Sequence, residues 1–184
     1  TVGNDQQSGV TGNAVQIYGG GTGSIPILFE DSEFFSTDRG CSNQDNGRSA
    51  VWIEESFAEF KDITVVSGDF GLSYRSSAGK VSGSTINVNC NGIDINGMIS
   101  VGTNEYAANV SGNTITTAEG TPITAYAGAL AEIHDNTVSG AAEGSGIGVQ
   151  SSRVTIHGNT IGPIGGWNGI WLYGSFDVDA QNNT

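Results

Sequence analysis

Basic residues are scarce in this chain of 184 residues, which carries 6 lysines and arginines against 19 aspartates and glutamates. The formal net charge of -13 argues against nucleic acid or an anionic membrane surface as a partner, because both are bound through basic patches. The chain also lacks any apolar run of about 18 residues, which excludes a membrane-spanning helix. No basic segment followed by an apolar one opens the chain, so we expect that any export signal has been removed.

Good helix formers are few, and no segment keeps a 3.6-residue apolar period. Glycine accounts for 29 residues, and asparagine, serine and threonine are abundant. This composition predicts an all-β, turn-rich protein, and the length predicts one domain over residues 1–184. The only cysteines, Cys41 and Cys90, form an even pair, which favours one disulfide and an oxidising compartment over two unrelated thiols.

A repeat organises the chain, and the segment 145–161 contains one whole unit of it. Two short alternating runs, Ile147-x-Val149 and Val154-x-Ile156, each place one side chain inward and the next outward. The first run recurs seven times, at intervals of 21 to 36 residues. Its first inward residues are Val15, Val51, Leu72, Ile93, Ile123, Ile147 and Ile170.

The second run also recurs seven times and always alternates with the first. It appears as Phe29-x-x-Ser32, Phe60-x-x-Ile63, Val81-x-x-Ser84, Val110-x-x-Asn113, Ile133-x-x-Asn136, Ile156-x-x-Asn159 and, less cleanly, Ala180-x-x-Asn183. A period near two dozen residues indicates a solenoid, and the scarcity of leucine and of helical patterns argues against leucine-rich and helical repeats. We therefore predict an all-β, right-handed parallel β-helix of about seven coils, in which neighbouring coils cover each other's core.

The pattern G-I-x-V-x-x-S-x-x-V-x-I-x-x-N-T-I in residues 146–161 resembles the repeats of right-handed parallel β-helix proteins of the pectin-lyase-like superfamily. The resemblance extends from about Asn13 to Thr184. It implies the fold but leaves the function open, because that superfamily includes polysaccharide lyases, glycoside hydrolases, epimerases, phage tailspikes, adhesins and surface-layer components.

Three asparagines, Asn113, Asn136 and Asn159, fall at one corner of successive coils. Asparagine tolerates the left-handed backbone of a tight corner, and stacked amides bond along the axis, so we expect an asparagine ladder. The ladder should be confined to the C-terminal half, because earlier coils carry other residues at this position, namely Ser32, Ile63 and Ser84.

Two insertions near residues 35–48 and 97–107 lengthen corners and should be surface loops. Cys41 lies in the first, and Cys90 lies in a link of the same corner type two coils later, so we predict a Cys41–Cys90 disulfide. Both chain ends are abrupt and show no capping helix. We expect a piece of a longer chain whose open β-helix ends stack on other copies or flanking domains.

Outward residues of the first run should form a stripe on one exterior face. In enzymes of the resembled superfamily the substrate groove runs along such a face. Glu54, Arg75 and Asp94 lie on three adjacent coils, and a cation between two carboxylates should depress both pKa values, which favours a salt-bridged face over catalysis. Aromatic side chains on the stripe are candidates for stacking on sugar rings: Trp52, Tyr126, Trp171 and Tyr173.

The remaining candidates are weaker. Lyase or epimerase chemistry would recruit Arg75, Lys80 and Asp94, and a calcium site would draw on Asp38, Asp45, Asp94 and Glu105, although solvated loop acids are the simpler interpretation. His134 and His157 should stack on adjacent coils without a cysteine or carboxylate column, so no metal site is predicted. Trp167 should cover the core edge, and Asn109 and Asn182 begin N-glycosylation sequons.

Two functions remain from the sequence. The first is a non-catalytic extracellular module of a cell-surface, surface-layer, sheath, filament or adhesin protein that binds glycans. The second is a carbohydrate-active enzyme, a polysaccharide lyase, glycoside hydrolase or epimerase, using the face that carries Glu54, Arg75 and Asp94.

Overall fold

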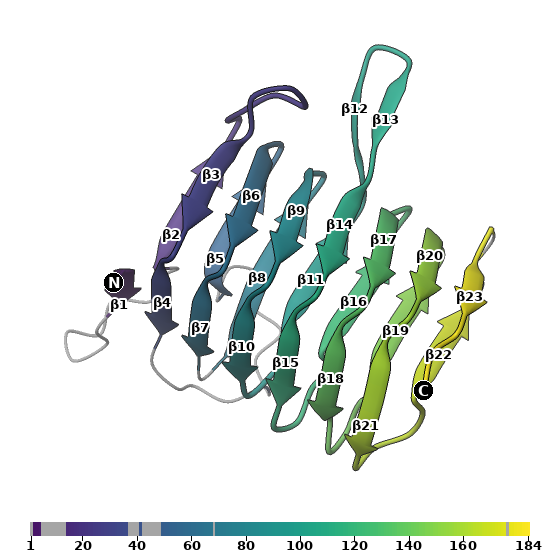
Figure 1. Cartoon of the computed structure of the whole chain (residues 1–184). Coiled ribbons are helices and arrows are strands. Elements are labelled where there is room, and N and C mark those ends of the chain that lie inside the picture. Colours follow the sequence, from purple (N-terminus) through teal and green to yellow (C-terminus); the bar gives the residue numbers. More distant parts are fainter. Residues whose placement is uncertain (1, 5–13, 37–40, 42–48, 68, 176) are drawn as a thin grey trace.

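The computed structural model describes residues 2–4, 14–36, 41, 49–67, 69–175 and 177–184. Every regular element in these ranges is a β-strand. The strands are stacked along one axis and form three parallel sheets of seven strands each, and every sheet runs the length of the solenoid (Figure 1). Successive strands of the chain pass from the first sheet to the second and then to the third. The predicted parallel β-helix of about seven coils is confirmed, and no described helix is long and apolar enough to cross a membrane.

The first sheet carries the recurring run that begins each coil. Its strands are β2 (Val15–Tyr18), β5 (Ser49–Glu54), β8 (Phe70–Arg75), β11 (Ile93–Asn96), β16 (Ile123–Tyr126), β19 (Ile147–Gln150) and β22 (Ile170–Tyr173). The strands pair in register, so that Val51, Leu72 and Ile93 lie side by side and are all fully buried.

The second and third sheets complete each coil. The second contains β3 (Ile27–Glu30), β6 (Phe57–Lys61), β9 (Ala78–Ser82), β14 (Ala108–Ser111), β17 (Leu130–His134), β20 (Arg153–His157) and β23 (Asp179–Gln181). The third contains β1 (Val2–Asn4), β4 (Glu33–Ser36), β7 (Thr64–Ser67), β10 (Thr85–Val88), β15 (Thr114–Thr117), β18 (Thr137–Gly140) and β21 (Thr160–Ile164).

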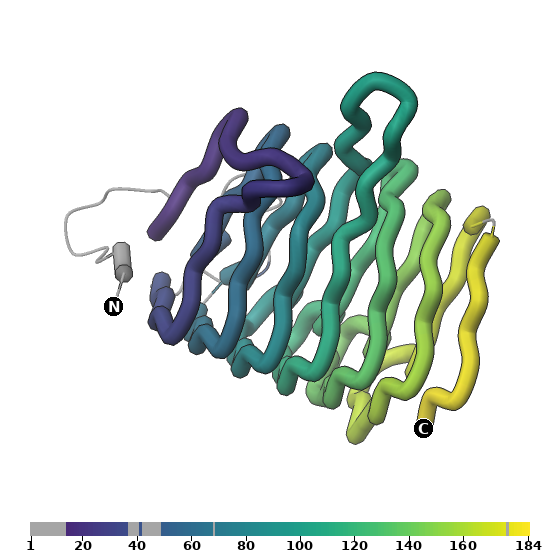
Figure 2. The backbone as a smooth tube through the Cα atoms, turned by 45° about the horizontal axis from the view of Figure 1, so that its top comes forward, coloured from purple at the N-terminus to yellow at the C-terminus, as the bar shows by residue number. Residues whose placement is uncertain are grey.

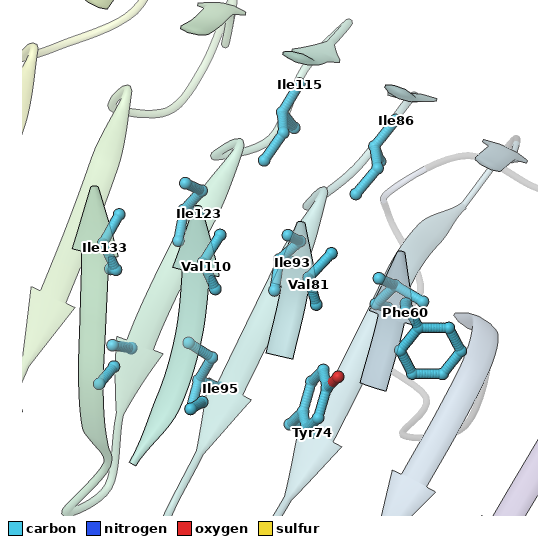
Figure 3. Close-up of a cluster of buried hydrophobic side chains, with 14 of the residues drawn as sticks. Phe60, Tyr74, Val81, Ile86, Ile93, Ile95, Val110, Ile115, Ile123 and Ile133 are labelled. Carbon is cyan, nitrogen blue, oxygen red and sulfur yellow. The ribbon is translucent and has the colours of Figure 1, made fainter. Parts of the chain in front are cut away.

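The core is a column of branched apolar side chains that point inward from all three sheets. Figure 3 shows Ile93, Val81 and Ile86, which point into the core from the first, second and third sheets respectively. β-branched residues suit this position because their stiff side chains pack well on a pleated surface. In the first coils aromatic rings take over, and Phe60 stacks on Phe29 with ring centroids 5.1 Å apart.

The asparagine ladder is confirmed at the corner between the second and third sheets. The Asn136 amide nitrogen donates to the Asn159 side-chain oxygen, and Asn113 donates likewise to Asn136, each at 2.9 Å. The expectation of a left-handed backbone at these asparagines is wrong. The left-handed residue comes one position earlier, as at Asp135 with φ of 55°, because the asparagine must turn inward to reach its neighbours.

The corner between the first and second sheets uses serine in the same way. The backbone N–H of Ser56 donates to the Ser77 hydroxyl, and that of Ala129 donates to the Ser152 hydroxyl. These contacts satisfy donors that would otherwise be buried without a partner. At both corners, side-chain hydrogen bonds thus join neighbouring coils in addition to the pairing of the strands.

The disulfide between Cys41 and Cys90 is confirmed and joins the first coil to the third, across a separation of 49 residues. The residues 97–107 form an antiparallel hairpin of β12 (Ile99–Val101) and β13 (Asn104–Tyr106), which projects beyond the coils (Figures 1 and 2). Most of the other predicted insertion, residues 37–40 and 42–48, lies outside the described residues.

Candidate functional site

A groove of about 580 Å³ lies on the outer face of the first sheet. Its floor is formed by outward side chains of β5, β8, β11, β16, β19 and β22, and its wall by the corners that lead into these strands. The Cys41–Cys90 disulfide is part of its lining. The groove therefore lies where the sequence predicted an outer stripe of polar and aromatic residues.

The register divides the outward side chains of the first sheet into two columns, most of whose members line the groove. One column contains Glu54, Arg75, Asn96, Tyr126, Gln150 and Tyr173, and the other contains Trp52, Ser73, Asp94, Thr124, Gly148 and Trp171. Glu54 and Asp94 thus lie in different columns as well as two coils apart, and their α-carbons are roughly 12 Å apart by sheet spacing. The expected single stack of Glu54, Arg75 and Asp94 is wrong.

Arg75 lies at the centre of the groove and is held by aromatic rings. Its guanidinium carbon is 5.0 Å from the Trp52 ring centroid and 5.6 Å from that of Tyr126. Its Nη1 donates to the Tyr126 hydroxyl at 2.6 Å. Only 18% of the side chain is exposed, and among the buried side-chain polar atoms of the described ranges only the Arg75 Nε has no hydrogen-bond partner.

Asp94 is buried rather than exposed on the outer stripe, with 5% of its side chain accessible. Its Oδ1 accepts from the Asn91 amide at 3.0 Å and from the Thr124 hydroxyl, while Oδ2 lies 3.9 Å from the Arg75 Nη2. Burial raises the pKa of Asp94, and this outweighs the lowering by Thr124, Asn91 and Arg75. Arg75 does lower this pKa, as expected, but the net shift is upward because burial is the larger effect.

Three of the four aromatic candidates line the groove, and each of them has different contacts. The Trp52 indole donates to Glu54 Oε2 at 3.0 Å, so the Glu54 carboxylate is tied to its own strand. Burial raises the pKa of Tyr126, with a smaller contribution from the Asp94 charge. Trp171 and Tyr173 stack on each other with centroids 5.7 Å apart and are exposed, although Tyr173 is not among the residues that line the groove.

Sequence reasoning missed the acids of the groove wall. Glu119 and Glu143 occupy equivalent corners of adjacent coils, and both line the groove. The signal was present as the repeated tripeptide Ala-Glu-Gly at residues 118–120 and 142–144. Trp167 also lines the groove and is 74% exposed, so the expectation that it covers the core edge is wrong.

Other predicted sets are not brought together. Lys80 lies on β9 in the second sheet and does not line the groove with Arg75 and Asp94. The Glu105 carboxylate pairs with Arg153, and no group of three potential metal ligands in the described ranges contains Glu105 or Asp94. Two more residues named for calcium, Asp38 and Asp45, lie outside the described residues.

The two sequons differ in accessibility. Asn182 is exposed at the corner after β23. Asn109 is half-buried in β14, and its amide donates to Glu132 Oε2 at 2.9 Å. Asn182 is therefore the more accessible of the two sites for attachment of a glycan.

The family described as the right handed beta helix region matches residues 2–161. The chain belongs to this right-handed β-helix family. No curated protein and no solved structure shows a significant match. Membership of the β-helix family therefore accounts for the fold, and arguments about function rest on the groove and on the side chains around it.

Proposed function

We propose that this protein is a non-catalytic, extracellular glycan-binding module, part of a cell-surface, surface-layer, sheath, filament or adhesin protein, and that the groove on the first sheet is its binding site. The observation that carries the proposal is Arg75, a partly exposed cation that lines the groove between the Trp52 and Tyr126 rings. Sugars combine ring faces that stack on aromatics with hydroxyls that accept hydrogen bonds from such a cation.

The length and shape of the groove support a chain-like ligand. The groove spans several coils from β5 to β22, with Trp52 near one end and Trp171 near the other. Spaced aromatic platforms suit a polymer of rings better than one small molecule. The disulfide supports an oxidising location, which is compatible with secretion.

Binding of soluble oligosaccharides and polysaccharides by calorimetry and affinity electrophoresis tests the proposal. We expect Trp52→Ala and Trp171→Ala each to weaken binding about tenfold, the loss of one aromatic contact worth roughly 1.4 kcal/mol. Tyr18→Ala is the matched control, because Tyr18 is an exposed aromatic on the same sheet that does not line the groove. Equal affinity of all three variants and the native chain would contradict the proposal.

The second candidate is a polysaccharide lyase, glycoside hydrolase or epimerase, and the environment of Asp94 favours it. A buried carboxyl whose pKa is raised is suited to proton transfer, and Arg75 beside it is suited to an acidic sugar. The test is release of reducing ends or unsaturated uronates from polysaccharides. Turnover that is abolished in folded Asp94→Asn and Arg75→Ala variants would replace the binding-module proposal by this one.

The proposed partners at the ends of the solenoid are other copies of the chain or flanking domains. Leu172 occupies an inward position of β22 yet is 47% exposed, because no described strand covers it. Backbone groups along the outer edge of such a strand favour pairing with a further strand. Concentration-dependent light scattering checks for copies, and scattering that stays monomeric at all concentrations would leave only flanking domains as partners.

A further inference from the structure

A second cluster of functional side chains lies on the outer face of the second sheet, apart from the groove. His134 ends β17 and His157 ends β20, and the two residues are register partners on adjacent strands. Their rings are stacked, with centroids 4.9 Å apart and planes 9° from parallel. Both side chains reach solvent, with 23% and 39% exposed.

Carboxylates approach this histidine pair from both sides. Asp135 Oδ2 lies 2.9 Å from His134 Nδ1, and Glu132 Oε1 lies 3.7 Å from His157 Nε2. The expectation that no carboxylate accompanies the histidines is therefore wrong. The left-handed backbone at Asp135 directs its carboxylate toward the ring of the preceding residue, His134. The pairing of β17 with β20 brings Glu132 beside His157 of the next coil.

We propose that His134, His157 and Asp135 form a binding site for a divalent transition metal of the zinc type, which links two adjacent coils. One donor atom from each of these residues lies within 4.8 Å of the others. Two imidazoles and one carboxylate are a ligand set that zinc, copper and nickel accept, with water completing the coordination. Calcium and magnesium prefer oxygen ligands and are not expected here.

Binding requires a small closure of the ring edges. Two zinc–nitrogen bonds of about 2.0–2.1 Å each place the two ligating nitrogens at most about 4 Å apart, whereas the donor atoms of the unliganded site lie within 4.8 Å of one another. Both side chains are partly exposed at strand ends, so the rings have room to tilt toward each other. Glu132, which also accepts from the Asn109 amide, acts as the positioning residue that fixes the orientation of His157.

The composition of the chain leaves few other side chains that could bind zinc or obscure the histidine signals. His134 and His157 are its only histidines, and its only two cysteines are joined in the disulfide. A tag-free, chelator-treated protein therefore shows two imidazole ring signals by NMR and has no free thiol that competes for metal. Titration with Zn²⁺, followed by calorimetry and NMR, should shift both ring signals and give one metal per chain.

Variants assign the ligands. We expect Glu132→Gln to weaken Zn²⁺ binding about tenfold or more, and His134→Ala or His157→Ala to weaken it further. Thr155→Ala is the matched control, because Thr155 is an exposed neighbour on β20 and should leave affinity unchanged. Gln181→His should tighten binding, because Gln181 is the register partner of His157 on the next strand and is exposed.

Two results would overturn the proposal. The first is that ring signals do not move at Zn²⁺ concentrations in excess of the protein. The second is that the double variant His134→Ala/His157→Ala keeps the native affinity and stoichiometry, which would place the metal on surface carboxylates. Far-ultraviolet circular dichroism of each variant verifies that the solenoid remains folded.

Discussion

At the scale of single residues, Asp94 shows that burial can affect the pKa of a carboxyl group more than a nearby opposite charge does. Arg75 is near enough to stabilise the carboxylate, and two hydrogen bonds do so as well. Removal from water is nonetheless the largest effect, and it favours the neutral acid. Protonation of Asp94 is therefore coupled to folding.

This coupling predicts a pH effect on stability. The folded-state pKa of Asp94 lies above the ordinary 3.8, so the folded chain binds more protons than the unfolded chain between the two values. Stability from this group is full below the ordinary pKa and is lost as pH rises through the folded pKa. Asp94→Asn removes this loss, so the unfolding free energy of the variant should rise relative to that of the native chain as the pH increases above the ordinary pKa of 3.8.

Urea unfolding at several pH values measures this difference. Glu143→Gln is the control, because it makes the same change from acid to amide at an exposed position on the groove wall. A difference between Asp94→Asn and the native chain that stays constant or shrinks with rising pH would show that burial does not dominate.

The asparagine ladder yields a second prediction at this scale. Asn136→Ala removes a side chain that accepts from the Asn113 backbone and donates to the Val110 carbonyl, both in the interior. Leaving such groups unpaired should cost about 3 kcal/mol of unfolding free energy. Asn87→Ala, at an exposed outward position of β10, should cost less than about 0.5 kcal/mol, and equal losses in urea unfolding would contradict a structural role for the ladder.

At the scale of elements, the strands are too short to be stable alone, and each gains its partners from the coils on either side. The hairpin of β12 and β13 is the exception, because its strands pair with each other. It contacts the body of the solenoid through Tyr106, whose ring packs edge-on against Phe57, and through the Glu105–Arg153 pair. None of its residues belongs to the main core.

Excision of the hairpin should therefore be tolerated. Replacing residues 97–107 by a two-residue turn should change the free energy of unfolding by less than about 1 kcal/mol, because the side-chain contacts that are lost are an exposed ion pair, one edge contact between rings and the contact of Met98 with Arg153. The backbone hydrogen bond from Gly97 to the Tyr126 carbonyl can be supplied by the first residue of the new turn. Urea unfolding and circular dichroism check this. Failure to fold would mean that the hairpin closes the second sheet's corner in a way that its contacts do not show.

At the scale of the whole molecule, the Cys41–Cys90 disulfide ties together coils that are not direct neighbours in the stack. A crosslink over a separation of 49 residues restricts the unfolded chain, which by the chain-entropy estimate is worth about 4 kcal/mol. The bond also lines the groove, so its loss affects the binding surface as well as the stability.

Paired replacement, Cys41→Ser with Cys90→Ser, should lower the unfolding free energy by about 3–4 kcal/mol. Urea unfolding of the oxidised native chain against the double variant measures this, with the reduced native chain as an independent check. Full retention of stability in both would indicate that the unfolded chain is already restricted by other means.

The repeat in the sequence was enough to predict the coils, their inward residues and the disulfide. Apolar residues at a spacing of two within a run fix which face is buried, and a recurring period fixes which runs become neighbours. The inward residues Val51, Leu72 and Ile93 were identified in this way, as were the stacked histidines.

How deeply an outward side chain is covered could not be read from the chain, because the corners between the sheets decide what lies over it. Asp94 is in a different column from Glu54 and is closed in by Asn91 and Thr124, and its pKa follows from that burial. Asp135 reaches His134 through a left-handed corner. Sequence periodicity determined the solenoid, whereas the tertiary structure alone decided its sites, since side-chain proximity across coils depends on register and corner geometry.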